Sequence, residues 1–158
     1  MDEQRGTTRA DEVVTAVLTA SRLLVAMSAR SLASVEDTLT LPQFRMLVVL
    51  DVRGALSLTR LAEHLAVNPS TAMRMADRLT AIGAVARRGN HADRREVRLE
   101  LTEAGRATVT EVTARRRAEI ASVVAAIPED QRTDLVRALR TFAVAGGEPP
   151  AVPPEQVW

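Results

Sequence analysis

Apolar residues recur every three to four positions through most of the chain, which is typical of amphipathic helices. Long stretches of this kind cover residues 11–36 and 102–145. Between them lie three shorter helical segments that begin at Thr40, Ser57 and Asn68, and these residue types commonly cap helix N-termini. The pattern predicts a mainly helical protein.

Residues next to these caps strengthen the prediction. Gln43 stands three positions after Thr40, as in a capping box, and Pro69 follows Asn68 at a position that tolerates proline. The helix that begins after Asn68 is expected to turn one apolar stripe inward: Ala72, Met75, Ala76, Leu79 and Ile82.

One part of the chain has a different period. Residues 84–88 form a short extended run, residues 96–101 alternate polar and apolar side chains, and a turn-rich segment joins them. The two runs predict a β-hairpin. The expected fold class is therefore mainly α with a small β-hairpin wing (α+β).

The domain organisation follows from the same pattern. We expect one domain over residues 11–145, with a winged helix-turn-helix lobe at about 41–101 and a helical lobe formed by residues 11–36 and 102–145. Residues 1–10 and the proline-rich residues 146–158 are expected to be disordered. The terminal helices carry more apolar surface than a lobe of about 60 residues can cover. A second copy of the chain is the natural cover, so we expect a homodimer.

Composition excludes several classes of function. The chain of 158 residues has no cysteine and two histidines, His64 and His91, which excludes thiolate chemistry and disfavours a histidine metal site. It has no glycine-rich phosphate loop, so we expect no catalytic residues, cofactor or metal. Aromatic residues make up 2%, too few for a platform on which the bases of single-stranded nucleic acid could stack.

No basic-then-apolar leader or apolar run of about 18 residues stands out, and we expect a cytoplasmic protein without a membrane segment.

The helix that begins after Asn68 carries the candidate binding residues. Its outward side chains are polar or cationic, with one methionine: Ser70, Thr71, Met73, Arg74, Asp77 and Arg78. Arg74 can bond both acceptors of a guanine edge, and Met73 can touch a thymine methyl group. Ser70 and Thr71, with free amides in the first helical turn, suit a phosphate oxygen or a base edge. The alternative is that Arg74 is solvated and pairs with Asp77.

The hairpin adds a local basic patch to a chain of net charge +1. Arg94 and Arg95 at its tip suit a narrow minor groove, although they are also consistent with ordinary surface charges. Of Arg87 and Arg88, we expect one to face a DNA phosphate and the other to face Asp77 or solvent.

These residues fall in an order that resembles the MarR family of bacterial transcription regulators. The matching segments are Leu41–Phe44, Leu61–Leu65, Pro69–Thr71, Arg74 with Asp77–Leu79, Gly83–Val85, Asp93–Arg95 and Leu99–Gly105. The resemblance implies a homodimer that binds pseudo-palindromic double-stranded DNA, usually as a repressor. It also implies that Asp93 orients the wing arginine, and that Ser70, Thr71 and Arg74 read the major groove. Met73 departs from the polar residue common in the family.

The resemblance further implies release of DNA by a small aromatic or lipophilic effector. Candidate pocket residues are Met27, Met46, His64 and Arg116. The sequence favours core filling for the methionines and a structural role for His64. Arg116 is also consistent with a guanidinium that extends to solvent or contacts a carboxylate of the partner chain. Two alternatives stay open: a winged-helix regulator without ligand response, and a protein-interaction module, a class that often lacks the wing arginines.

Overall fold

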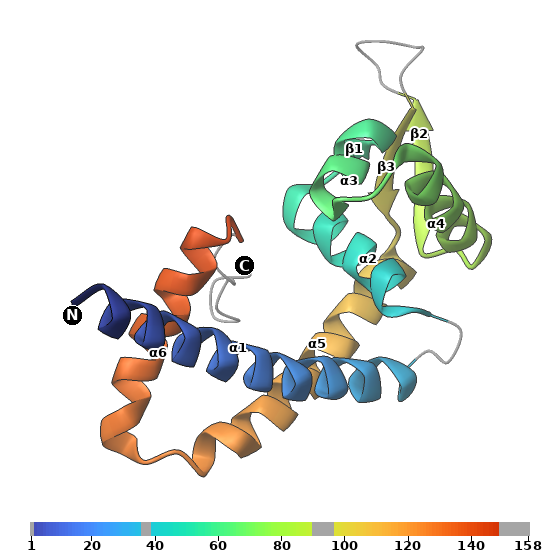
Figure 1. The fold of residues 1–158 in the computed structure, drawn as a ribbon. Helices are drawn as coiled ribbons and strands as arrows, with labels where there is room; N and C mark the ends of the chain where they lie inside the picture. The colour runs from blue at the N-terminus through green and yellow to red at the C-terminus, as the bar shows by residue number, and fades with distance from the viewer. Residues whose placement is uncertain (1, 36–38, 90–96, 149–158) are drawn as a thin grey trace. The chain divides into compact units, whose positions relative to one another are not determined.

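The computed structural model describes residues 2–35, 39–89 and 97–148, with side chains from residue 9 onward (Figure 1). The elements in chain order are α1 (Asp2–Ala33), α2 (Leu41–Arg53), β1 (Leu56–Ser57), α3 (Leu58–Leu65), α4 (Pro69–Ala81), β2 (Val85–Gly89), β3 (Val97–Leu101), α5 (Glu103–Ala125) and α6 (Glu129–Ala145). This mainly helical fold with one small antiparallel sheet confirms the expected class. The chain divides into two compact units, Met1–Arg117 and Ala118–Trp158.

Side-chain caps fix the starts of the three short helices. The amide of Thr40 donates to Gln43 Oε1 at 2.9 Å and the amide of Gln43 donates to Thr40 Oγ1 at 3.4 Å, which completes the predicted capping box. Ser57 Oγ accepts from the Arg60 amide at 3.4 Å. Asn68 Oδ1 accepts from the Thr71 amide at 2.8 Å. The starts of α2, α3 and α4 therefore lie where the sequence predicts them.

The sheet has the strand order β1-β3-β2, and both strand pairs are antiparallel. In its register Val85 lies opposite Leu101, and Arg88 lies opposite Arg98. The sequence did not predict β1, because a strand of two residues is too short to show an alternating pattern.

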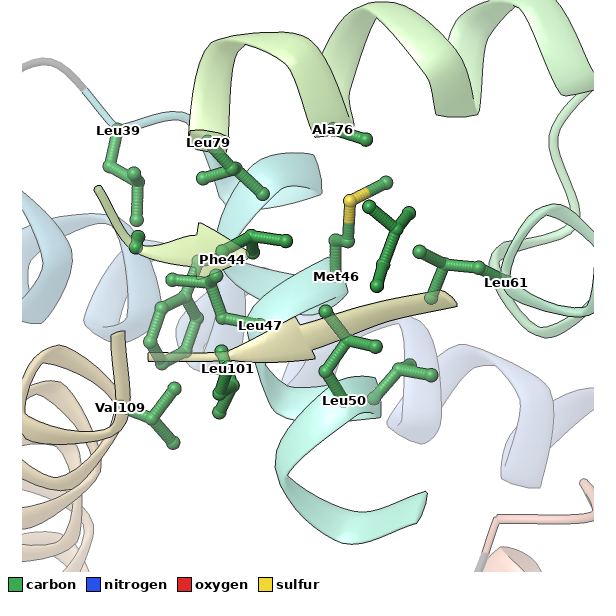
Figure 2. Close-up of a cluster of buried hydrophobic side chains, with 14 of the residues drawn as sticks. Leu39, Phe44, Met46, Leu47, Leu50, Leu61, Ala76, Leu79, Leu101 and Val109 are labelled. Atoms are coloured by element: carbon green, nitrogen blue, oxygen red, sulfur yellow. The ribbon is translucent and has the colours of Figure 1, made fainter. Parts of the chain in front are cut away.

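The core of the N-terminal unit lies where α2, α3, α4, β3 and α5 meet (Figure 2). Its least exposed large side chains, at 0% exposure, are Met46, Leu47, Leu61 and Leu79. Replacing one of these leucines with alanine is expected to cost about 2–5 kcal/mol, because the cavity left behind does not collapse fully. The core packs against one face of α4, and the opposite face of the helix is exposed to solvent.

One predicted core residue of this region is exposed. Ile82 was expected to continue the inward stripe of α4, but its side chain is 45% exposed. The helix ends at Ala81, and Ile82 adopts φ −88° and ψ 4° at the C-cap. Because Ile82 is already outside the regular helix, the period of 3.6 residues no longer places it on the buried face.

A polar junction attaches the start of α5 to the end of α4. Thr102 Oγ1 donates to the Gly83 carbonyl at 2.6 Å and accepts from the Gly105 amide at 3.1 Å. The Thr102 amide donates to the Ala84 carbonyl at 3.2 Å. Gly105 is buried, and a Cβ atom there would overlap the Ala84 carbonyl oxygen. These contacts explain why a Thr-x-x-Gly sequence stands at this position.

Helix α1 differs from the sequence prediction in two respects. It begins at Asp2, so residues 2–10 are helical where a disordered segment was expected. Its stretch Arg9–Ala33 is long and apolar enough to cross a membrane by length and composition alone, although the sequence was expected to hold no such run. Such a helix is weak evidence of a membrane segment. Val13, Val14 and Leu18 are each more than half exposed.

Helix α6 has no buried residue. The side chains expected on its core side are only partly covered, with Leu135 half-buried and Leu139 and Phe142 56% and 57% exposed. Arg132 fixes the turn before it, because the guanidinium donates to the carbonyls of Ala125 and Ile127 at 3.2 and 2.9 Å. Of the predicted disordered tail, residues 149–158 lie outside the described part of the chain.

Candidate DNA-contacting surface

Helix α4 separates apolar and polar residues on opposite faces. Ala72, Ala76 and Leu79 are 0% exposed, and Met75 packs half-buried against the core. On the other side Ser70, Met73, Arg74, Asp77 and Arg78 are exposed, and Thr71 is half-buried. The sequence predicted most of this division, but Thr71, expected to face outward, is half-buried, and Ile82, expected to face inward, is exposed. The exposed side offers hydroxyl, thioether and guanidinium groups on one rigid helix.

The first turn of α4 is held by its own cap. Asn68 Oδ1 accepts from the Ser70 hydroxyl and from the Thr71 amide, both at 2.8 Å. The Thr71 amide is therefore not available to a phosphate, contrary to the expectation from the sequence. Because the Ser70 hydroxyl hydrogen is already donated, the remaining role of its oxygen is to accept a hydrogen bond.

A hollow of about 610 Å³ lies between α2 and α4. It is lined by Gln43, Thr71, Arg74, Met75, Asp77 and Arg78. Arg74 Nη2 donates to Thr71 Oγ1 at 3.4 Å, one turn back along the helix. Arg74 therefore lies along the surface of α4 instead of pairing with Asp77, the alternative that the sequence left open.

Two arginines of β2 pair with carboxylates on different elements. Arg87 pairs with Asp77 of α4, and Arg88 Nε donates to Glu100 Oε1 of β3 at 2.6 Å. Neighbouring side chains on a strand point to opposite faces, so the two arginines diverge. Of the two partners that the sequence left open for one of these arginines, Asp77 or solvent, the structure shows Asp77, and the arginine is Arg87.

The expected wing-tip residues Asp93, Arg94 and Arg95 lie outside the described residues. Within the described ranges, no group of three or more His, Asp or Glu side chains is placed to hold a metal ion.

The four candidate pocket residues differ in burial. Met46 is 0% exposed in the core, Met27 is 4% exposed on α1, and His64 is exposed on α3. Arg116 is half-buried on α5, and its buried Nε has no hydrogen-bond acceptor among the described residues. None of the four lines the hollow beside α4. Arg116 is therefore the candidate whose guanidinium could still form a hydrogen bond with a ligand or a partner chain.

Comparison with known proteins gives consistent matches. The family model described as the MarR family matches residues 39–97. The HTH-type transcriptional repressor MdtR of Bacillus subtilis (strain 168) is 36% identical over 89 residues, which span 56% of this chain and 57% of that protein.

Solved structures of similar proteins cover most of the chain. The crystal structure of RV1404 from Mycobacterium tuberculosis is 47% identical, with a TM-score of 0.85 over 90% of this chain and 97% of that one. BpsR of Bordetella bronchiseptica is 28% identical, with a TM-score of 0.63 over 83% of this chain and 92% of that one. DNA binding of BpsR is regulated by 6-hydroxynicotinic acid. With these matches and the winged-helix geometry, the chain belongs to the MarR family, whose members are transcription regulators and not enzymes.

Proposed function

We propose that this protein is a sequence-specific regulator that binds a pseudo-palindromic operator in double-stranded DNA as a homodimer, and that it acts as a repressor in the cytoplasm. The observation that carries the proposal is the division of helix α4 into two faces. Ala72, Ala76 and Leu79 are fully buried on one face, and the opposite face exposes Ser70, Met73, Arg74 and Arg78. A helix held in this way presents a fixed set of side chains to a major groove.

Each exposed residue of α4 has a specific role in this proposal. Arg74 reads a guanine. Among the described residues its guanidinium is held along the helix only by a long hydrogen bond to Thr71, so it turns outward at little cost. Ser70 accepts from a base amino group, since its hydrogen is already donated to Asn68. Met73, 46% exposed, contacts a thymine methyl group.

Other residues position the protein on the duplex. Arg78, the Thr71 hydroxyl and Arg88 contact phosphates. Arg88 is 70% exposed, and its ion pair with Glu100 is weak enough to rearrange toward a phosphate. At the wing tip, Asp93 orients Arg94 or Arg95 into the minor groove.

The uncovered apolar surfaces of α1 and α6 support the homodimer. On α1, Val14 and Leu18 are exposed, and on α6, Leu139 and Phe142 are exposed. Large exposed apolar patches are rare on monomeric proteins and mark interaction surfaces. A dimer also places two copies of α4 against successive major grooves, which lie about 34 Å apart.

An effector response is the second part of the proposal. The similar protein BpsR responds in this way, since its DNA binding is regulated by 6-hydroxynicotinic acid. We propose a small aromatic or lipophilic effector for this chain too, with Arg116 supplying the polar contact and Met27 part of the apolar wall. Met46 and His64 suit this role less well, one being sealed in the core and the other exposed on α3.

The test is a titration against duplex DNA enriched from a random pool by binding to this protein. Each phosphate contact should contribute a slope of about −0.9 in the plot of log affinity against log salt. Arg74→Ala should weaken binding to the enriched duplex by about 1–3 kcal/mol and relax specificity locally. Changing Arg94 and Arg95 together to alanine should weaken binding to all sequences.

The matched control is Arg137→Ala on α6, which removes an exposed arginine outside the proposed surface and should leave DNA binding unchanged. An affinity that does not vary with salt would contradict DNA binding and favour a protein-interaction module. Sedimentation at micromolar concentration tests the dimer. If no aromatic acid or lipophilic compound alters the affinity for DNA, the result would favour a regulator without ligand response.

A further inference from the structure

An acidic residue stands among the groups proposed to meet DNA. Asp77 is exposed on α4 and lines the same hollow as Arg74 and Arg78. A carboxylate at this position would repel the phosphate backbone if it were alone. Its partner Arg87 comes from β2, ten residues further along the chain, so the ion pair joins the helix to the first strand of the wing.

The strand side of this contact is also well defined. The backbone of β2 is fixed by its register with β3, in which Arg87 lies opposite Leu99. The next residue, Arg88, points to the other face of the sheet and bonds Glu100 there. Arg87 is therefore the member of the pair that faces α4.

The pair is poorly suited to stabilising the fold. The side chains of Arg87 and Asp77 are 44% and 55% exposed, and exposed ion pairs contribute little to stability. The backbone already joins α4 to β2 through the Ala84 amide, which donates to the Leu79 carbonyl at 2.9 Å. What the side-chain pair adds is a second attachment, two residues earlier on α4 and three residues further along toward the wing, which limits how β2 tilts against α4.

We propose that Asp77 and Arg87 are positioning residues for operator recognition. Their pairing holds the base of the wing against α4, so that the helix and the wing reach their two grooves at the same time, and it neutralises an acid that would otherwise face the DNA. Neither residue reads a base. This inference rests on the proposed DNA-binding function and concerns how well the protein discriminates between sequences.

Positioning and simple charge predict opposite results when the acid is removed. If Asp77 only contributes negative charge, Asp77→Asn strengthens binding to every duplex by a similar factor. If the pair positions the wing, the same change weakens binding to the enriched duplex, while binding to a mixed-sequence duplex is unchanged or stronger. The informative quantity is the ratio of the two affinities.

The experiment measures both affinities for the full-length protein by fluorescence anisotropy at two salt concentrations. We expect Asp77→Asn and Arg87→Gln each to lower the ratio about fivefold, and the double variant to lower it no further than either single change. The conservative variant Arg87→Lys, which keeps the charge, should recover most of the ratio. Thermal melting of each variant should stay close to that of the wild type, because the pair is exposed.

Two further arginines serve as matched controls. Arg88→Gln, on the same strand, should weaken binding to both duplexes alike and leave the ratio unchanged, as expected for a phosphate contact. Arg137→Gln on α6 should change neither affinity. A ratio that Asp77→Asn and Arg87→Gln leave unaltered would overturn the inference while leaving DNA binding intact. Wild-type protein that binds no duplex would instead overturn the proposed function.

Discussion

Gly105 is the position where the structure makes the sharpest prediction about stability. It lies in the first turn of α5 and is buried against the end of α4. A Cβ atom at this position would overlap the Ala84 carbonyl oxygen and stand 3.0 Å from both the Ala84 carbonyl carbon and Leu101 Cδ2. Gly105→Ala is therefore expected to destabilise the protein, although alanine is the better helix former.

The size of the effect follows from two opposing terms. Overpacking commonly costs about 1–3 kcal/mol, and the upper end applies here because the obstacle is backbone. The Ala84 carbonyl cannot retreat freely, since it accepts from the Thr102 amide and the Ala84 amide donates to the Leu79 carbonyl. Higher helix propensity returns about 1 kcal/mol. The net loss of about 2 kcal/mol should lower the melting temperature by about 4–8 °C.

The assay is thermal unfolding followed by circular dichroism at a fixed protein concentration, because the proposed dimerisation would make the midpoint concentration-dependent. Gly89→Ala is the matched control, since a Cβ atom there meets nothing within 4 Å. Ala107→Gly, at an exposed position of α5, calibrates the propensity term. The argument from close backbone contact is wrong if Gly105→Ala melts at or above the wild-type temperature. It is also wrong if Gly89→Ala lowers the melting temperature by as much as Gly105→Ala.

Two further changes test local contacts. Asn68→Ala removes the cap of α4 and should lower the free energy of unfolding, measured in urea, by about 1 kcal/mol. Asn68→Ser keeps a capping oxygen and should retain most of the wild-type stability. An equal loss of stability in both variants would contradict the capping role. Arg116→Met replaces a buried Nε that has no acceptor among the described residues and should raise the free energy of unfolding by about 1 kcal/mol in effector-free protein. A destabilised Arg116→Met variant would indicate that the second chain supplies an acceptor.

The sequence predicted the short helices well because their signals are local. A cap such as Asn68 and the amide that it satisfies lie within three residues, so the chain itself carries the information. The same is true of the capping box at Thr40 and Gln43. Ile82 was misplaced because a periodic pattern does not show at which residue the helix stops.

Contacts between distant segments were harder to predict. Strand β1 exists only because it pairs with β3, about forty residues later in the chain, and nothing in Leu56 and Ser57 indicates that pairing. The sequence predicted different partners for Arg87 and Arg88, but only the register with β3 decides which one meets Asp77. The sequence predicted which face of α6 is apolar, but it does not show what packs against that face. No residue of α6 is buried within the described part of the chain.

Two kinds of attachment hold the wing to α4, and they should respond differently to mutation. The backbone attachment runs through the Ala84 amide and the Thr102 junction beside Gly105, and it is part of the fold itself. The side-chain attachment between Asp77 and Arg87 is exposed and adds little to stability. Changes at Gly105 should therefore reduce the amount of folded protein before they alter which DNA it prefers. Changes at Asp77 or Arg87 should alter the preference in fully folded protein, so the ratio of affinities and the melting temperature separate the two attachments.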